Sequence, residues 1–323
     1  MISQLENKIA NKTAKCAVIG MGYVGLPLAM EFAAKGYKVY GVDIAKEKIN
    51  NLKAGVSYIV DIRSSDIKKL VTAKKLVPTW DFAVLSESDM IIVCVPTPLA
   101  KTKEPDMSFI ISAADEIKKH LRSGQLIVLE STTYPGTTDE VLLSMFEETG
   151  LKAGKDFFLA FSPERIDPSN PKFVTKNIPK IMGGVTPVCT KIAMKFYSKV
   201  IDRLVEVSSS KVAEMAKLYE NTFRSVNIAL ANELCLICDK LGVDVWEVID
   251  AASTKPFGFM PFYPGPGIGG HCIPVDPYYL TWKSRVYGFD PRFIELAAEV
   301  NHGMPEYVVG RIQDILNDRK KSI

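Results

Sequence analysis

Cys272 lies in a segment that offers a thiol room to react. The stretch PGPGIGGHCIPVDP, residues 264–277, surrounds this cysteine with glycine and proline, whereas a cysteine that only packs belongs on an apolar helix or strand face. A nucleophile needs space for its substrate to approach, and the glycines leave that space. The adjacent His271 raises a cysteine–histidine protease as an alternative, but neighbouring residues of an extended segment point apart. The surroundings of Cys272 therefore argue against a packing role, and adjacency alone does not make His271 its catalytic partner.

A glycine-rich turn near the start of the chain has the spacing of a dinucleotide site. Gly20, Gly22 and Gly25 fit G-x-G-x-x-G within KCAVIGMGYVGLPLAMEFAAKGYKVYGVD, residues 15–43, which also predicts a strand, an amphipathic helix and a second strand. The first glycine allows a tight turn, the second lets backbone approach a pyrophosphate, and the third lets helix pack on strand. Asp43 ends the second strand, where a carboxylate binds a ribose diol and repels a 2′-phosphate. The sequence predicts NAD rather than NADP; the alternative is a tight turn that binds nothing.

Further apolar runs predict a doubly wound parallel sheet. They lie at residues 89–98, 124–133, 157–165 and 180–185, mostly with helical stretches between them. Ligands of such sheets bind beyond the carboxyl ends of the strands. Thr97, Thr132 and Glu164 occupy three of these ends, so we expect them to face one crevice.

A long uninterrupted amphipathic helix is predicted over residues 211–241, followed by the cysteine segment. A helix of this length is typical of one that spans domains or pairs with a second subunit, and we expect a homodimer through it. Lys217 and Asn221 are one turn apart and share a face. Cys235 and Cys238 lie within the same helix without further ligands nearby in the sequence, so we expect them to pack rather than to bind a metal.

Composition narrows the function classes. The chain has 323 residues, 47% of them hydrophobic, and a net charge of +3 from 40 basic and 37 acidic residues. This balance indicates neither nucleic-acid nor membrane-surface binding. No apolar run reaches the roughly 18 residues of a membrane span, and the start of the chain lacks a secretory signal. Six cysteines in such a chain indicate reduced thiols, and His120, His271 and His302 are too dispersed to indicate a metal site. We expect a soluble cytoplasmic protein.

Six motifs in order resemble the UDP-sugar 6-dehydrogenases of the UDP-glucose/GDP-mannose dehydrogenase superfamily, which use NAD to convert a nucleotide sugar to its uronic acid. The motifs are GMGYVGLPLA, VPTP, ESTTYPGTT, SPERIDP, AKLYENTFRSVNIALANEL and PGPGIGGHCIPVDPYYL, and the resemblance runs from about Lys15 to the chain end. The SPERIDP and GGHCIPVDPYYLTWK forms resemble most the branch that acts on UDP-N-acetylhexosamines, particularly UDP-N-acetylglucosamine. The resemblance implies a Rossmann-like α/β domain over residues 1–206, an all-α central domain over 207–303 and the start of a linker over 304–323. It also implies a UDP-binding domain that would begin near where this sequence stops, which makes full activity of the chain a question.

The resemblance implies a four-electron oxidation that passes through Cys272. The thiolate would capture the C6 aldehyde as a thiohemiacetal, which becomes a thioester on the second oxidation and is then hydrolysed. Lys217 and Asn221 would stabilise oxyanions on C6, and Asp276 would orient a water or the lysine.

Other positions are implied to hold water, cofactor or substrate. Thr132 and Glu164 would hold the water used as base and in hydrolysis. The implied cofactor contacts are Gly20, Gly22, Tyr23, Val24, Gly25, Asp43, Lys48, Thr97 and Thr132. The implied substrate contacts are Glu164, Arg165, Lys217, Asn221, Phe262, Tyr263 and Gly269.

Two departures from the family pattern and several alternatives remain. Pro168 stands where the UDP-glucose enzymes carry a second glutamate, and Lys255 is the nearest candidate for a basic residue given by a partner subunit.

The same chemistry on UDP-N-acetylmannosamine or UDP-glucose is one alternative. A two-electron 3-hydroxyacid dehydrogenase is another, although it has no use for the cysteine. A third is an NAD-binding, dimerising chain without turnover.

Overall fold

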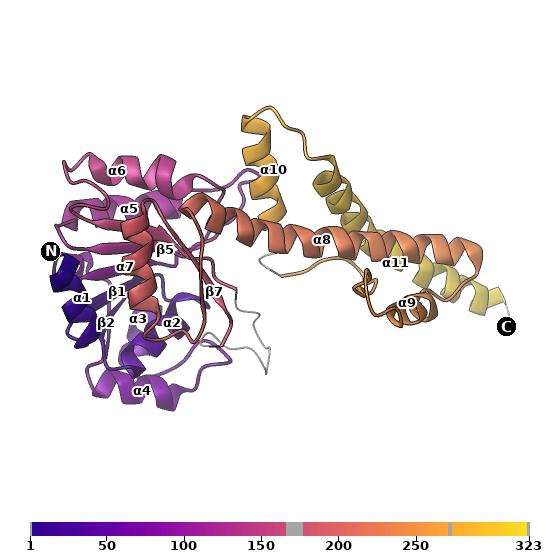
Figure 1. Ribbon diagram of the computed structural model, residues 1–323. Helices are drawn as coiled ribbons and strands as arrows, with labels where there is room; N and C mark the ends of the chain where they lie inside the picture. The colour runs from indigo at the N-terminus through magenta and orange to yellow at the C-terminus, as the bar shows by residue number, and fades with distance from the viewer. Residues whose placement is uncertain (1, 166–176, 271–272, 322–323) are drawn as a thin grey trace. The chain divides into compact units, whose positions relative to one another are not determined.

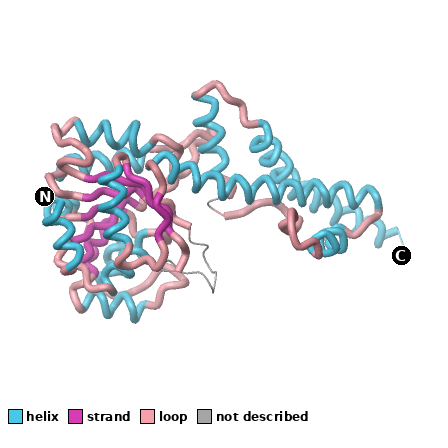
Figure 2. Tube along the Cα trace, viewed as in Figure 1, coloured by secondary structure: helices cyan, strands magenta, loops and turns pink. Residues whose placement is uncertain are grey.

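The computed structural model describes residues 2–165, 177–270 and 273–321, which form two compact units. The first unit comprises Met1–Ala100 and Pro105–Lys217, and the second comprises Lys101–Glu104 and Leu218–Ile323. Figures 1 and 2 show strands in the first unit, whereas the second is helical. Each unit is described by itself.

The first unit is built on an eight-stranded sheet in the order β3-β2-β1-β4-β5-β6-β7-β8. The chain adds β2 and β3 on one side of β1 and then returns to add β4 and the later strands on the other side, as in doubly wound folds. The strands are β1 Lys15–Ile19, β2 Lys38–Val42, β3 Leu76–Thr79, β4 Met90–Val93, β5 Leu126–Leu129, β6 Phe158–Phe161, β7 Lys180–Gly184 and β8 Leu204–Glu206.

Helices cover both faces of this sheet (Figure 1), because the strands are apolar on both sides. In β1, Cys16 and Val18 face a core formed with α1, α2, α3, α4 and α7, while Ala17 and Ile19 face a core formed with α5 and α6. The helical elements are α1 Ile2–Ala10, α2 Gly25–Ala34, α3 Lys46–Lys53, α4 Ser64–Thr72, the 3₁₀ segment η1 Phe82–Glu87, α5 Ser108–His120, the π-helical segment η2 Thr137–Leu142, α6 Leu143–Glu147 and α7 Pro187–Tyr197.

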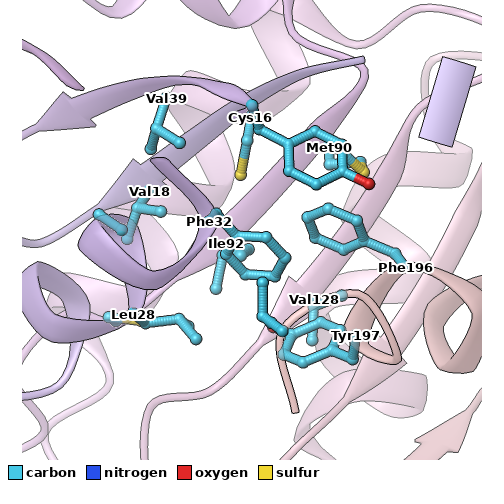
Figure 3. Packing of buried hydrophobic residues seen from close by; sticks show 14 of the residues in the cluster. Cys16, Val18, Leu28, Phe32, Val39, Met90, Ile92, Val128, Phe196 and Tyr197 are labelled. Atoms are coloured by element: carbon cyan, nitrogen blue, oxygen red, sulfur yellow. The ribbon is translucent and has the colours of Figure 1, made fainter. Parts of the chain in front are cut away.

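Aromatic packing fixes α7 on the first core. The rings of Phe32 and Phe196 stack with centroids 4.2 Å apart, and Tyr197 meets Phe32 edge to face at 5.7 Å (Figure 3). Aromatic pairs in these geometries stabilise a core beyond their buried area. They hold α7 against α2, the helix that follows the glycine turn.

The predicted doubly wound fold is confirmed, with one correction. The run at 180–185 was expected in a parallel sheet, but β7 pairs antiparallel with β6, Ala160 opposite Gly184. An apolar run buried on both faces reads the same in either direction, so the sequence does not reveal this reversal. The short strands β3 and β8 were not expected either.

The second unit is formed by helices. They are most of α8 Ser210–Leu241, then α9 Val245–Ser253, α10 Asp276–Val286 and α11 Arg292–Lys321. The helix predicted over 211–241 is confirmed as α8, and α11 lies beside it (Figure 1). Cys238 is buried against Val245 and Ile249 of α9, and Cys235 packs on the same cluster, as expected of packing residues. Within the described residues, no helix has both the length and the apolar character needed to cross a bilayer.

Candidate functional site

The glycine turn between β1 and α2 has two positions that accept no side chain and one that is open. Gly20 has φ +95°, and a Cβ there would lie 2.4 Å from the carbonyl oxygen of Cys94. A Cβ on Gly25 would lie 1.8 Å from the carbonyl oxygen of Gly20. At Gly22 a Cβ would meet nothing within 4 Å. Packing therefore requires the first and third glycines, while the second leaves backbone accessible, which fits a pyrophosphate that approaches the N-terminus of α2.

Asp43, at the end of β2, is tied to this turn. Its side chain is 8% exposed, and one carboxylate oxygen accepts a hydrogen bond from the backbone N–H of Met21 at 2.8 Å. The other oxygen accepts from the N–H of Ala45, also at 2.8 Å, and Lys48 Nζ lies 3.4 Å from the carboxylate. A charged acceptor held in this way beside a glycine turn suits a ribose diol.

Two further predicted cofactor residues flank the start of α2. Val24 is the residue before the helix and packs partly against the first core, whereas Tyr23 is 57% exposed. The turn, Asp43 and these neighbours form a site whose shape and charge fit NAD. NAD, when bound, accepts a hydride from the substrate.

Thr97, Thr132 and Glu164 follow β4, β5 and β6, which are adjacent and parallel in the sheet. The three residues are partly buried. The loops after β4 and β5 are joined by Ser131, whose hydroxyl donates to the carbonyl of Val95 at 2.8 Å. The structure thus places all three predicted residues beyond one edge of the sheet.

A buried charge network that the sequence analysis missed lies behind Glu164. Lys180 Nζ contacts Glu130 at 2.8 Å and Glu164 at 3.2 Å, and the Tyr197 hydroxyl donates to Glu130. Burial raises the pKa of Glu130, against the opposing effect of Lys180. Arg165, a predicted substrate contact, donates from its guanidinium to the carbonyl of Pro179 at 2.6 Å. The only signal in the sequence is a charged residue at the boundary of an apolar run.

A second residue that sequence reasoning missed anchors the start of α8. Glu214 accepts hydrogen bonds from the backbone N–H of Gly136 at 2.6 Å and of Thr138 at 2.9 Å, and from the Thr138 hydroxyl at 2.7 Å. These groups begin η2, which shortly follows Thr132. Burial raises the pKa of Glu214 to about 7, although its hydrogen bonds oppose the shift. Lys217, one turn further along α8, is buried.

In the second unit, the structure brings Asn221 and Asp276 together. Both are buried, and the Asn221 amide donates to the Asp276 carboxylate. Asp276 is the first residue of α10. Cys272 and His271 lie outside the described residues, as does Pro168, so the predicted nucleophile cannot be placed against this pair.

The predicted substrate residues of the second unit lie before the cysteine. The Tyr263 ring stacks on Trp246 with centroids 5.5 Å apart, and its hydroxyl donates to Asp250 at 2.7 Å. Phe262 meets Phe223 of α8 edge to face at 5.8 Å. Gly269 has nothing within 4 Å of a would-be Cβ, so this part of the segment is open. Among the residues that the structure describes, no group of three or more His, Cys, Asp or Glu side chains is arranged to hold a metal ion.

Comparison with known proteins finds two domains of one protein family in this chain. The NAD binding domain of the UDP-glucose/GDP-mannose dehydrogenase family matches residues 14–201, and the central domain of that family matches residues 211–303. The UDP-N-acetyl-D-glucosamine 6-dehydrogenase of Pseudomonas aeruginosa is 40% identical over 96% of this chain and 72% of its own length. The 3-hydroxyacid dehydrogenase alternative does not account for these matches.

Two solved structures of UDP-sugar dehydrogenases are also similar to this chain. The UDP-D-ManNAc dehydrogenase of Pyrococcus horikoshii aligns with a TM-score of 0.89 at 37% identity, covering 95% of this chain and 72% of that one. The UDP-N-acetyl-mannosamine dehydrogenase of Staphylococcus aureus aligns with a TM-score of 0.83 at 35% identity, covering 94% and 71%. The chain therefore belongs to the UDP-glucose/GDP-mannose dehydrogenase family and is an NAD-dependent oxidoreductase.

Proposed function

We propose that this chain oxidises the C6 hydroxyl of a UDP-N-acetylhexosamine, foremost UDP-N-acetylglucosamine, to the uronic acid through a thioester on Cys272. The observation that supports the proposal is the buried hydrogen bond from the Asn221 amide to the Asp276 carboxylate. Asp276 is the first residue of α10 and follows Cys272 by four residues in the sequence. The relative from P. aeruginosa, named for UDP-N-acetyl-D-glucosamine, supports the choice of sugar.

In this proposal the residues of the chain divide the chemistry. Cys272 adds as a thiolate to the C6 aldehyde, and Lys217 with Asn221 stabilises the oxyanion that forms. Asp276 holds the Asn221 amide in place. Once the second oxidation has given the thioester, Thr132 and Glu164 orient the water that hydrolyses it, and Cys272 leaves as a thiolate.

The cofactor would be held by the glycine turn and the end of β2. Gly20, Gly22 and Gly25 would admit the pyrophosphate, with Tyr23 and Val24 beside it. Asp43 and Lys48 would bind the adenosine ribose, and Thr97 and Thr132 would line the nicotinamide end. Arg165, Phe262, Tyr263 and Gly269 would contact the nucleotide sugar.

We also propose a homodimer that forms through α8. This helix exposes Tyr219, Leu230, Ile237 and Leu241, each at about half its surface or more. Large apolar side chains in this number on one helix are typical of a protein–protein contact. Sedimentation equilibrium tests it: a monomer at micromolar concentration would contradict the proposal, and Leu230→Glu with Ile237→Glu should shift a dimer to monomer.

The test of the activity is a panel of UDP-sugars with NAD, counting NADH formed per sugar consumed. The proposal expects two NADH per sugar, with UDP-N-acetylglucosamine turned over fastest. Preference for UDP-N-acetylmannosamine or UDP-glucose would replace the substrate but keep the chemistry. One NADH per sugar would contradict the thioester route. NAD binding without turnover of any sugar would favour the non-catalytic alternative.

The Cys272→Ser variant separates oxidation of the sugar from release of the free acid. The variant should stop before free acid, with sugar held as an ester or released as aldehyde, because an alkoxide is a poorer leaving group than a thiolate. Cys235→Ser on α8 serves as the matched control and should retain acid formation, since that cysteine only packs. Unchanged acid formation by Cys272→Ser would rule out the thioester.

A further inference from the structure

We propose that Lys180 is a positioning residue for the Glu164 carboxylate, shared with Glu130 in a buried triad that orients Glu164 for thioester hydrolysis. The inference rests on the proposed role of Glu164 in orienting water. It adds a residue for which the family motifs quoted above give no role.

The strand reversal brings these residues together. Because β7 runs antiparallel to β6, with Phe161 opposite Gly183, the start of β7 lies beside the chain that leaves the end of β6. Lys180 therefore lies at the edge of the sheet where the parallel strands end. Glu130 reaches the same place as the residue directly after β5.

The Lys180 ammonium is satisfied on all sides. It has three N–H donors, and three acceptors lie within reach: Glu130 at 2.8 Å, Glu164 at 3.2 Å and the carbonyl oxygen of Pro163 at 3.3 Å. Three directed contacts fix the ammonium in one orientation. A lysine used only to neutralise charge has no need of this geometry.

Burial divides the roles within the triad. The side chains of Glu130 and Lys180 are 0% and 5% exposed, whereas that of Glu164 is 12% exposed. Glu130 is further held by the hydroxyl of Tyr197, which is anchored in the aromatic core. The inner carboxylate and the lysine thus form a rigid support, and the outer carboxylate lies at the accessible end.

Electrostatics explain why the lysine is needed. Two carboxylates next to each other in a dry interior compete for one proton. Burial alone lowers the pKa of Lys180, but Glu130 and Glu164 outweigh burial and raise it, so the lysine stays charged between them. Within the part of the chain that the structure describes, the other ionisable groups that interact with the triad include Arg165, Tyr197, Cys94 and Cys16. Burial raises the pKa of the Tyr197 hydroxyl and the Cys94 thiol, which keeps both neutral.

Held in this way, Glu164 is able to receive a proton. One of its oxygens contacts Lys180 and the other accepts the backbone N–H of Arg165 at 2.7 Å. In hydrolysis the water oxygen bonds to the thioester carbon, its proton passes to Glu164, the carbon–sulfur bond breaks and Cys272 leaves as a thiolate.

The experiment compares Lys180→Met/Glu130→Gln with wild type and with Glu164→Gln in the full chain. The double variant removes one positive and one negative charge, so the net charge of the triad is unchanged. We expect an unchanged KM, a kcat lower by about 10- to 100-fold, and an acid limb of the kcat–pH profile moved to higher pH. Mass spectrometry of quenched enzyme should show the sugar thioester accumulating.

Two further variants sharpen the result. Lys180→Arg keeps the charge and the donors and should restore the position of the acid limb. Lys195→Met removes a lysine whose partially exposed ion pair with Glu6 lies on the surface of the same unit, and should leave kcat and profile unchanged.

The outcomes separate the two proposals. If Glu164→Gln slows hydrolysis but the double variant keeps the kcat and pH profile of wild type, Lys180 has no positioning role and the inference is wrong. If Glu164→Gln itself hydrolyses the thioester at the wild-type rate, the proposed function of Glu164 is wrong. If the double variant does not fold, Lys180→Arg decides: an acid limb and rate equal to wild type support the inference, and a loss of rate without adduct accumulation overturns it.

Discussion

Asn232 of α8 donates a side-chain hydrogen bond to Asn301 of α11 at 2.8 Å, and both amides are buried. The Asn232 carbonyl oxygen accepts the backbone N–H of Gly265 at 2.9 Å, and the Asn301 amide donates to the carbonyl of Ser225 at 3.1 Å. The pair therefore fixes the start of the cysteine segment to two helices of the second unit.

Asn232→Leu should loosen this attachment. The substitution removes the partner of the partly buried Gly265 N–H and of the buried Asn301 carbonyl oxygen, and an unpaired buried polar group costs about 1–3 kcal/mol. Urea unfolding followed by circular dichroism measures the loss. Asn227→Leu is the control, because the Asn227 amide bonds the Phe223 carbonyl of its own helix. Equal unfolding free energies for the two variants would show that the pair does not anchor the segment.

Gly25→Ala should lower the stability of the first unit, whereas Gly22→Ala should weaken NAD binding. The Gly25 variant forces a methyl group against the Gly20 carbonyl oxygen and should destabilise the first unit by about 3 kcal/mol. The Gly22 variant should unfold within about 0.5 kcal/mol of wild type yet bind NAD about tenfold more weakly, because its methyl group occupies the approach of the pyrophosphate. Thermal unfolding and calorimetric titration with NAD check both. Tight NAD binding by Gly22→Ala would place the pyrophosphate elsewhere.

Asp43→Asn should weaken NAD binding more than NADP binding. The amide keeps the shape of the side chain but loses the charge that attracts the ribose diol and repels a 2′-phosphate. A charged hydrogen bond is worth about 1.5–3 kcal/mol, so NAD affinity should fall by about 10- to 100-fold. Calorimetry with each dinucleotide measures the ratio of affinities. Asp81→Asn, at the corresponding end of β3, serves as a control, since Asp81 accepts the Ala83 N–H and should leave that ratio unchanged.

Glu214 should make folding stability depend on pH. Its pKa is about 7 in the folded chain against an ordinary 4.5, so between these pH values the folded chain binds the proton more tightly than the unfolded chain. Its contribution to the unfolding free energy therefore falls as pH rises from about 4.5 to about 7, by about 3 kcal/mol in total.

Glu214→Gln isolates this contribution. The variant removes the titration, so the difference in unfolding free energy between wild type and variant should change across this pH window and level off above it. Glu233→Gln, exposed on the same helix, should show no such change. A difference that stays constant with pH for Glu214→Gln would mean that burial does not perturb this carboxyl.

Local rules explain what the sequence predicted. The run that becomes β1 is apolar at consecutive positions, and Gly20 and Gly25 are required by contacts within the same strand–turn–helix unit and its neighbouring strand. Asp43 was expected at the end of β2 and is found there beside the turn. Thr97, Thr132 and Glu164 were placed at one edge because parallel strands end at the same edge, and β4, β5 and β6 are neighbours.

The triad of Glu130, Lys180 and Glu164 shows where such reasoning stops. Lys180 reaches the edge of the sheet only because β7 is antiparallel, and nothing in the run KIMGGV encodes the direction of its neighbour. Glu214 and its partners in η2 are likewise distant in sequence, and their pairing depends on where α8 begins against the sheet. Contacts of this kind follow from the tertiary arrangement, so periodicity and motif spacing do not reveal them.

The crowding around Gly20 and Gly25 also limits which substitutions could change the dinucleotide cofactor that this protein uses. Both positions are blocked by main-chain atoms, which cannot move aside as a flexible side chain can. Engineering of dinucleotide preference is thus confined to the junction of β2 and α3, where Asp43 and Lys48 meet. A library that randomised the codons of Asp43 and Lys48 would explore the accessible solutions, whereas one that randomised Gly20 and Gly25 would yield mostly unfolded chains.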